Sequence, residues 1–111
     1  MQEQEIILCA ANWYDDGVIR TFKPKNMSNG FMTCGHRHHN CIQTFAQIVG
    51  FPYTPEAQKL HNTEMQGFLT NKNRFVDRKE AYKIAFEANQ IQGPNKGHSE
   101  NSIGLTSEDL Y

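Results

Sequence analysis

The chain lacks a surplus of positive charge, a long apolar run and any internal repeat. Its eleven Lys and Arg residues stand against twelve Asp and Glu residues, so the formal net charge is -1. This balance excludes a strongly basic protein that binds nucleic acid without regard to sequence, because such binding depends on surplus positive charge that displaces counterions. The longest apolar run, residues 6–11, is far too short to span a bilayer. We therefore expect neither DNA nor a membrane as a partner.

Cysteine is scarce as well. The three cysteines, Cys9, Cys34 and Cys41, are an odd number and lack the spacing of a disulfide framework, which favours a reducing, intracellular setting. The acidic residues 1–5 do not resemble the basic start of a secretory signal. A cytoplasmic protein is the expectation.

What the chain does contain is sufficient for one folded domain. It has 111 residues, of which 38% are hydrophobic, with one Trp, four Tyr and seven Phe. This is a polar but foldable composition, and the length fits a single domain over residues 1–111. A chain of this size buries roughly two thirds of its unfolded surface, enough for one modest core.

The order of apolar segments predicts an α+β fold with a small antiparallel sheet of about five short strands. The strands are predicted over residues 6–13, 18–22, 31–34, 67–70 and 74–76. Residues 15–17 (Asp-Asp-Gly) and 71–73 (Asn-Lys-Asn) have turn chemistry. Connections this short join antiparallel rather than parallel strands.

Two main helices are predicted from apolar stripes with helical spacing. The first stripe consists of Ile42, Phe45, Ala46 and Val49. The second consists of Ala81, Ile84, Ala85 and Ala88. Gly50 is placed to cap the end of the first helix, and Asp77 with Glu80 forms a capping-box-like start of the second.

Three other segments are predicted to lie outside the main elements. Residues 51–66 read as a surface excursion with a helical turn near residues 56–60. Residues 93–104 are rich in Gly and are expected to form a flexible loop. Residues 105–111 are expected to form a short C-terminal tail.

Residues 34–41 (CGHRHHNC) hold the densest set of reactive side chains and connect a predicted strand to a predicted helix. Two thiols and three imidazoles suit zinc, but no second ligand pair stands at finger spacing, and adjacent histidines point to different faces of a helix. An anion site is the other hypothesis, because a helix start offers free N–H groups and a positive dipole end, to which Arg37 and His38 add donors. A structural role also stays open, with Cys41 buried and one His as a cap.

A second cluster lies between residues 72 and 83. It holds five of the eleven basic residues, namely Lys72, Arg74, Arg78, Lys79 and Lys83. The planar fork of an Arg side chain matches phosphate oxygens, and a nucleobase can stack on the face of Phe75. Neighbouring Asn and Asp side chains, Asn73 among them, can bond sugar hydroxyls. The alternative is that Phe75 belongs to the core and the basic side chains form a solvated helix face.

The residues give little support for catalysis. Cys41 could be paired with His38 as a thiolate nucleophile, but no orienting acid or oxyanion loop can be identified. On the residues alone the function stays open. One hypothesis is a metal-dependent phosphodiesterase or nuclease that uses His36, His38, His39 and Asp77, and another is a zinc-stabilised protein-binding module.

Five strings stand along the chain: GHRHHNC (35–41), QGFLT (66–70), RFVDRKEA (74–81), ANQI (88–91) and SEDLY (107–111). In these strings the chain resembles the small phage proteins of the first-described Thoeris anti-defence family. The resemblance implies a sponge that binds a cyclic ADP-ribose isomer made by a TIR-domain enzyme and sequesters it without cleavage, in the cytoplasm of the infected bacterial host. It also implies a homodimer or a dimer-based hexamer and, for some members, separate sites for cyclic oligonucleotides of the CBASS type.

The strings that carry the resemblance contain most of the residues that chemistry also selects. The expected ligand-binding set is Arg37, His38, Asn73, Arg74, Phe75 and Arg78. No catalytic residue, metal or cofactor is expected. A cyclic ADP-ribose carries a pyrophosphate, an adenine and two riboses, so a few Arg side chains or helix starts and a stacking ring meet its needs. The near-neutral net charge is no obstacle, because only the pocket must be positive.

Overall fold

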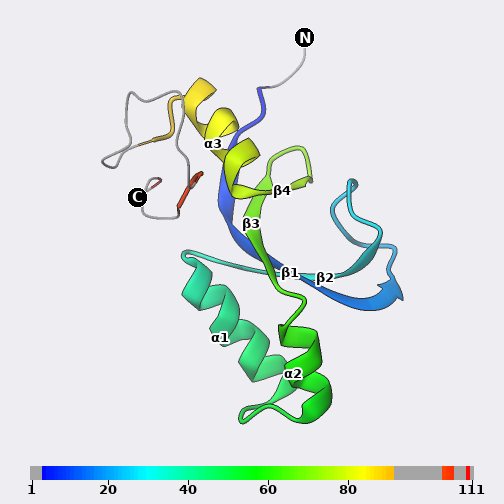
Figure 1. The fold of residues 1–111 in the computed structure, drawn as a ribbon. Coiled ribbons are helices and arrows are strands. Elements are labelled where there is room, and N and C mark those ends of the chain that lie inside the picture. The colour runs from blue at the N-terminus through cyan, green and yellow to red at the C-terminus, as the bar shows by residue number, and fades with distance from the viewer. Residues whose placement is uncertain (1–3, 92–103, 107–109, 111) are drawn as a thin grey trace.

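Four antiparallel strands and three helices build the fold in the computed structural model, which describes residues 4–91, 104–106 and 110 (Figure 1). The strands are β1 (Ile7–Ile19), β2 (Asn29–Gly35), β3 (Met65–Thr70) and β4 (Phe75–Val76), and the helices are α1 (His38–Val49), α2 (Pro55–His61) and α3 (Arg78–Glu87). The sheet has the order β2-β1-β3-β4. The predicted α+β class is confirmed, with one strand fewer than expected in this part of the chain. Most of the loop predicted over 93–104 lies outside the described residues.

The prediction that residues 6–13 and 18–22 form two strands joined by a tight turn is wrong. β1 does not reverse at the Asp-Asp-Gly turn signal but continues to Ile19, and its pairing with β2 jumps from Tyr14–Phe31 to Ile19–Asn29. Within the jump, the amides of Gly17 and Val18 donate to the carboxylates two residues before them, at 2.9 and 3.0 Å. Because these side chains satisfy the backbone locally, the segment forms a bulge. The chain reverses later, in residues 20–28.

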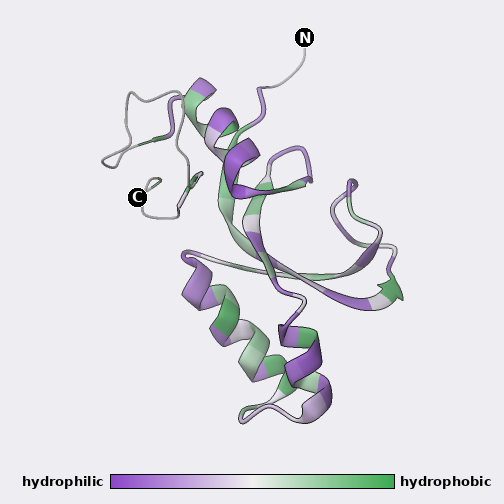
Figure 2. Cartoon of the chain, viewed as in Figure 1, coloured by the Kyte–Doolittle hydropathy of each residue, from purple (hydrophilic) through white to green (hydrophobic). Residues whose placement is uncertain are grey.

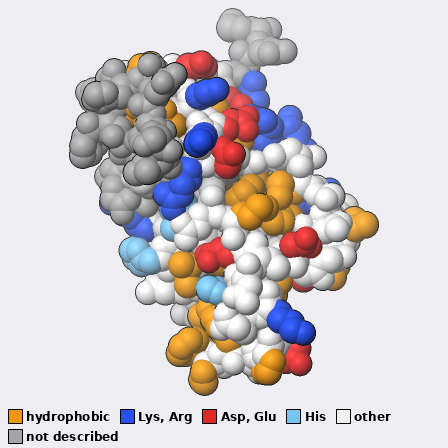
Figure 3. Space-filling view, in the orientation of Figure 1, with side chains coloured by type: hydrophobic (Ala, Val, Ile, Leu, Met, Phe, Trp, Pro, Cys, Tyr) orange, Lys and Arg blue, Asp and Glu red, His pale blue; other side chains and the backbone are white. Residues whose placement is uncertain are grey.

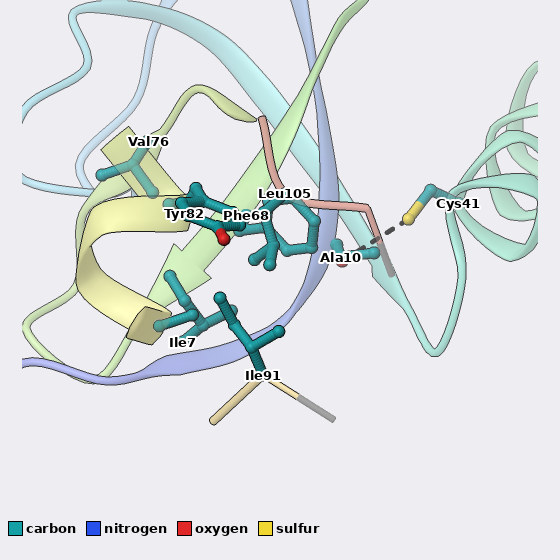
Figure 4. Packing of buried hydrophobic residues seen from close by; sticks show 10 residues of the cluster. Ile7, Ala10, Cys41, Phe68, Val76, Tyr82, Ile91 and Leu105 are labelled. Atoms are coloured by element: carbon teal, nitrogen blue, oxygen red, sulfur yellow. Dashed lines mark hydrogen bonds between the residues drawn. The ribbon is translucent and has the colours of Figure 1, made fainter. Parts of the chain in front are cut away.

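The main core lies between one face of the sheet and helices α1 and α3 (Figure 4). Its buried members are Ile7, Ala10, Cys41, Phe68, Val76, Ala81, Tyr82, Ala85, Ile91 and Leu105. Hydrophobic and hydrophilic residues alternate along α1 and α3 in Figure 2, as expected for helices that bury one face. Strands that are distant in sequence therefore contribute to one hydrophobic core together with both predicted helices.

Helix α1 buries a face rotated from the predicted one. Its buried residues are His38, Cys41 and Phe45, whereas Ile42, Ala46 and Val49 of the predicted stripe are half-buried. Phe45 belongs to both faces and stacks on Tyr14 with the ring centroids 4.1 Å apart. The rotation follows from His38 and Cys41, whose side chains bond to Gly67 O and Ala10 O of the sheet. The cap at Gly50 is confirmed, because its φ is 90° and its N–H donates to Ala46 O.

Helix α3 and the C-terminal segment pack together. The Asp77 side chain accepts from the backbone N–H of Glu80 at 2.8 Å, which confirms the predicted cap. Leu105, the first residue of the predicted tail, is fully buried, and its N–H donates to Arg78 O at 2.8 Å. Gly104 lies so close that a Cβ there would be 2.5 Å from the Arg78 carbonyl carbon. The beginning of this segment is therefore part of the core.

A smaller apolar cluster covers the other face of the sheet. Ala11, Trp13 and Phe75 are buried there, and Met27, Met32 and Leu69 pack against them. The helical turn predicted near residues 56–60 is confirmed as α2, which the Thr54 side chain caps. Of the helices that the structure describes, none is both long and apolar enough to cross a membrane.

Candidate functional site

Two helices begin over the same stretch of β3. At the first turn of α1, His38 Nε2 lies 2.9 Å from the carbonyl oxygen of Gly67, and the ring meets Phe68 edge-on at 5.0 Å. At the first turn of α3, Arg78 Nη2 donates to Gln66 Oε1. Because Gln66, Gly67 and Phe68 are consecutive, both helix starts are anchored within three residues of one strand. We call Arg37, His38, Gln66 and Arg78 the helix-start site.

The two helix starts differ in their electrostatics. The first turn of α1 contains no acidic residue, so no carboxylate there offsets its positive dipole end. Arg37 precedes this turn as the N-cap residue, and its backbone N–H donates to Asn40 Oδ1 at 3.0 Å. The start of α3 carries Asp77 and Glu80 and is partly neutralised. An anion is therefore favoured more at α1 than at α3.

The side chains of the helix-start site are partly withdrawn from water. His38 is 9% exposed, and the Nη1 atom of the half-buried Arg37 is buried. Because the partner of His38 Nε2 is a carbonyl oxygen, this nitrogen must carry the hydrogen. Figure 3 shows Arg and Lys side chains running from α3 toward the start of α1, where His side chains follow. The arrangement can donate hydrogen bonds to phosphate oxygens.

Arg74 lies in an ion-pair network rather than at the helix-start site. Its guanidinium donates twice to the Glu5 carboxylate, with Nε–Oε2 at 2.9 Å and Nη2–Oε1 at 3.0 Å. A third bond joins Nη2 to Glu80 Oε2 at 2.8 Å. The guanidinium of Arg74 lowers the pKa of Glu5 below its ordinary value of 4.5. Two carboxylates thus already occupy the donors that a phosphate would use.

Asn73 and Phe75 also lie apart from the two helix starts. Asn73 forms the tip of the β3–β4 turn with a φ of 56°, and its side chain donates to Lys23 O at 3.3 Å. Phe75 is 7% exposed and packs against Trp13, with the ring centroids 6.0 Å apart. Of the six predicted residues, the structure therefore places Arg37, His38 and Arg78 at the two helix starts.

The reactive side chains of residues 34–41 are dispersed. Cys41 is buried, and its thiol donates to Ala10 O at 3.5 Å on the helix-covered face, whereas Cys34 is exposed. Burial raises the pKa of Cys41 to about 11, so at neutral pH this thiol is protonated and a poor nucleophile. In residues 4–91, 104–106 and 110, no three His, Cys, Asp or Glu side chains are grouped to hold a metal ion.

Sequence reasoning missed a buried polar cluster beneath α2. Asn12 is fully buried, and its Nδ2 donates to Glu64 Oε1 at 2.5 Å. The Tyr14 hydroxyl lies 3.4 Å from the same carboxylate oxygen, and His61 Nε2 lies 3.6 Å from Glu64 Oε2. Burial raises the pKa of Tyr14 to about 12. The sequence signal for this cluster was Asn12, a polar residue inside an apolar strand. The cluster ties the end of α2 to β1.

A surface hollow of about 360 Å³ lies elsewhere on the molecule. Its lining residues are Asp15, Asp16, Glu56, Lys59, Leu60 and Thr63. Three carboxylates against one ammonium make this hollow unsuitable for an anion, and none of the six predicted residues lines it. The helix-start site thus remains the stronger candidate for a phosphate-bearing ligand.

Fold and site together define a small α+β protein with an anion-suited corner where two helices begin. The chain belongs to the phage T4 y16D protein family, because a model of that family matches residues 6–111. No curated protein and no solved structure matches the chain. The phage origin implied by the sequence resemblance is thereby supported.

Proposed function

We propose that this phage protein binds a cyclic ADP-ribose isomer and sequesters it without cleaving it, in the cytoplasm of the infected bacterial host. The observation that supports the proposal is the position of Arg37, His38 and Arg78 at two helix starts that are anchored on consecutive residues of β3. The family match supports a phage setting, and the resemblance of the sequence strings suggests the ligand class.

The chemistry of such a ligand fits the helix-start site in two respects. A pyrophosphate would be attracted to the positive dipole end at the start of α1, where the first turn contains no carboxylate. Arg37 and Arg78 would each add a charge-assisted hydrogen bond. The Nε2–H group of His38 donates to Gly67 O and thereby holds the start of α1 against β3.

The adenine requires a stacking ring that the helix-start site does not itself supply, because Phe75 is buried on the other face of the sheet. Phe22 and Phe51 are 95% and 77% exposed. We therefore propose that a second copy of the chain completes the pocket, in the homodimer or dimer-based hexamer that the resemblance implies. Cyclic oligonucleotides remain a second ligand class to be tested.

A thermal-shift titration with cyclic ADP-ribose isomers, with and without chelator, tests the proposal. We expect a ligand-dependent rise in Tm that chelator does not change, and mass spectrometry of the heat-released ligand should find it intact. A hydrolysed product would refute sequestration, and chelator-sensitive turnover would favour the metal-dependent phosphodiesterase. Parallel titrations with cyclic oligonucleotides define the ligand class.

Matched variants locate the binding site. Arg78→Gln should weaken binding by about 10- to 100-fold, since one charge-assisted hydrogen bond is lost. Lys79→Gln removes the same charge from the next, exposed residue of α3 and should change binding little. Equal losses in the two variants would indicate a general charge effect and contradict the assignment. Arg37→Gln should behave like Arg78→Gln.

A further inference from the structure

Cys9 and Cys34 lie beside each other on neighbouring strands. Cys34 of β2 is directly opposite Ala11 of β1. Cys9 is two residues before Ala11, in a part of β1 that pairs with β3 without a break. Side chains two residues apart on a strand point to the same face, so Cys9 and Cys34 are diagonal neighbours on one face of the sheet. Each thiol shifts the pKa of the other, as expected for sulfurs that lie close together.

The third cysteine is separated from this pair. Cys41 lies on the opposite, helix-covered face, where it is 0% exposed and bonded to Ala10 O. Cys34 is exposed and Cys9 is partly exposed. A reagent in solution can therefore reach the pair but not Cys41, which makes Cys41 an internal control.

The two thiols interact and differ in acidity. The interaction with Cys34 lowers the pKa of Cys9 to about 7, whereas the interaction with Cys9 raises the pKa of the Cys34 thiol. A thiol with a pKa near neutrality attacks disulfides efficiently. Cys9 is therefore suited to be the attacking sulfur, with Cys34 as its resolving neighbour.

We propose that Cys9 and Cys34 form an oxidisable dithiol, which a small-molecule disulfide such as oxidised glutathione converts to an intramolecular disulfide between β1 and β2. The proposal does not depend on the proposed function, because it invokes no nucleotide. It concerns the end of β2, from which the chain passes directly into Arg37 and His38.

The reaction proceeds in two exchanges. In the first, the Cys9 thiolate attacks one sulfur of oxidised glutathione, a Cys9–glutathione bond forms, and one glutathione thiolate leaves. In the second, the Cys34 sulfur attacks the Cys9 sulfur, the Cys9–Cys34 bond forms, and the second glutathione leaves. The proton of Cys34 passes to a departing glutathione thiolate. The two cysteines lose two electrons, which oxidised glutathione gains.

The full chain is incubated with oxidised glutathione and unfolded in the presence of an alkylating reagent, and its intact mass is measured by mass spectrometry. We expect one thiol of the three to be alkylated, no retained glutathione, and a monomer on non-reducing electrophoresis. Peptide mapping should place the bridge between Cys9 and Cys34 and the alkyl group on Cys41. A bridge between Cys9 and Cys34 closes the chain segment between them into a loop and should raise Tm by roughly 10 °C. Dithiothreitol should reverse the change.

Variants separate the two steps. Cys34→Ser should retain glutathione on Cys9, because no neighbouring thiol resolves the mixed disulfide, and the rate of its formation should rise with pH through about 7. Cys41→Ala should form the same bridge as the unmodified chain. A bridge that includes Cys41, covalent dimers, a stable glutathione adduct on the unmodified chain, or three alkylated thiols would each overturn the proposal.

Discussion

Arg74 is the predicted ligand residue whose surroundings most strongly suggest a role in stability. Its guanidinium forms two parallel hydrogen bonds to Glu5 and one to Glu80. The Glu5 side chain is 17% exposed, whereas that of Glu80 is 49% exposed. Glu5 precedes β1 and Arg74 precedes β4, so the pair joins the first described residues to the far edge of the sheet. Replacing Arg74 with Met removes the charge and keeps much of the apolar stem.

The structure sets the size of the expected loss. The bidentate, mostly buried pair with Glu5 should contribute about 1–2 kcal/mol, between the values of exposed ion pairs and of buried charged hydrogen bonds. The single bond to the exposed Glu80 should contribute at most about 0.5 kcal/mol. Arg74→Met should therefore lower the free energy of unfolding by about 1–2.5 kcal/mol. Lys79→Met, which removes an exposed charge nearby, should cost little.

The loss should depend on pH in a defined direction. The pKa of Glu5 is lowered in the folded chain by the Arg74 hydrogen bond, from an ordinary value of 4.5. A carboxylate with a lowered folded pKa stabilises the fold fully above its unfolded pKa and loses this contribution as pH falls through the folded pKa. The difference between the unmodified chain and Arg74→Met should therefore shrink as pH falls below 4.5.

Urea unfolding followed by circular dichroism measures the free energy of unfolding of the unmodified chain and of each variant. Double-mutant cycles with Glu5→Gln and Glu80→Gln then separate the contributions of the two ion pairs. The coupling energy of Arg74 with Glu5 should exceed that with Glu80. Equal couplings, or a loss that persists unchanged in acid, would refute the reasoning. If Arg74→Met left stability unchanged and weakened nucleotide binding, Arg74 would belong to the ligand site after all.

Three further outcomes are expected. Leu105→Ala should lower the free energy of unfolding in urea by about 2–4 kcal/mol, because the side chain is fully buried in the core; no change would show that this residue does not dock. Gly67→Ala should prevent folding or cost several-fold more than Gly17→Ala in the same assay, since its Cβ would lie 2.2 Å from Val76 O, whereas nothing lies within 4 Å of a Cβ at Gly17. The stability contributed by Tyr14, whose pKa is raised to about 12, should be complete below pH 10 and lost as pH rises through 12. Tyr14→Phe should remove that part of the alkaline slope in pH-dependent unfolding, and an unchanged slope would contradict burial of the phenol.

Local signals predicted most elements of the fold. The Asp77 cap, the Gly50 helix end and the Asn-Lys-Asn turn act over a few residues, so their outcome follows from neighbouring side chains. The Asp-Asp-Gly segment misled the prediction because the same chemistry forms a turn or a bulge. β1 pairs with β2 and β3 along its length, and this pairing favours a bulge over a reversal of the chain at this segment. This choice depends on strands distant in sequence.

The candidate site was predictable only in part. Sequence chemistry selected Arg37, His38 and Arg78, which the fold assembles at two helix starts. It equally selected Arg74 and Phe75, because an Arg or Phe side chain suits either a ligand or a structural partner. Their partners, Glu5 and Trp13, lie 69 and 62 residues earlier in the chain.

The amino-acid sequence by itself determined the α+β class, the helices and their caps, and the near-neutral net charge, because these depend on composition and on spacing within a few residues. Tertiary structure alone decided which face α1 buries, which basic side chains are neutralised by carboxylates, and which two thiols become neighbours. These outcomes arise from contacts between residues far apart in the chain. Local spacing carries no information about them.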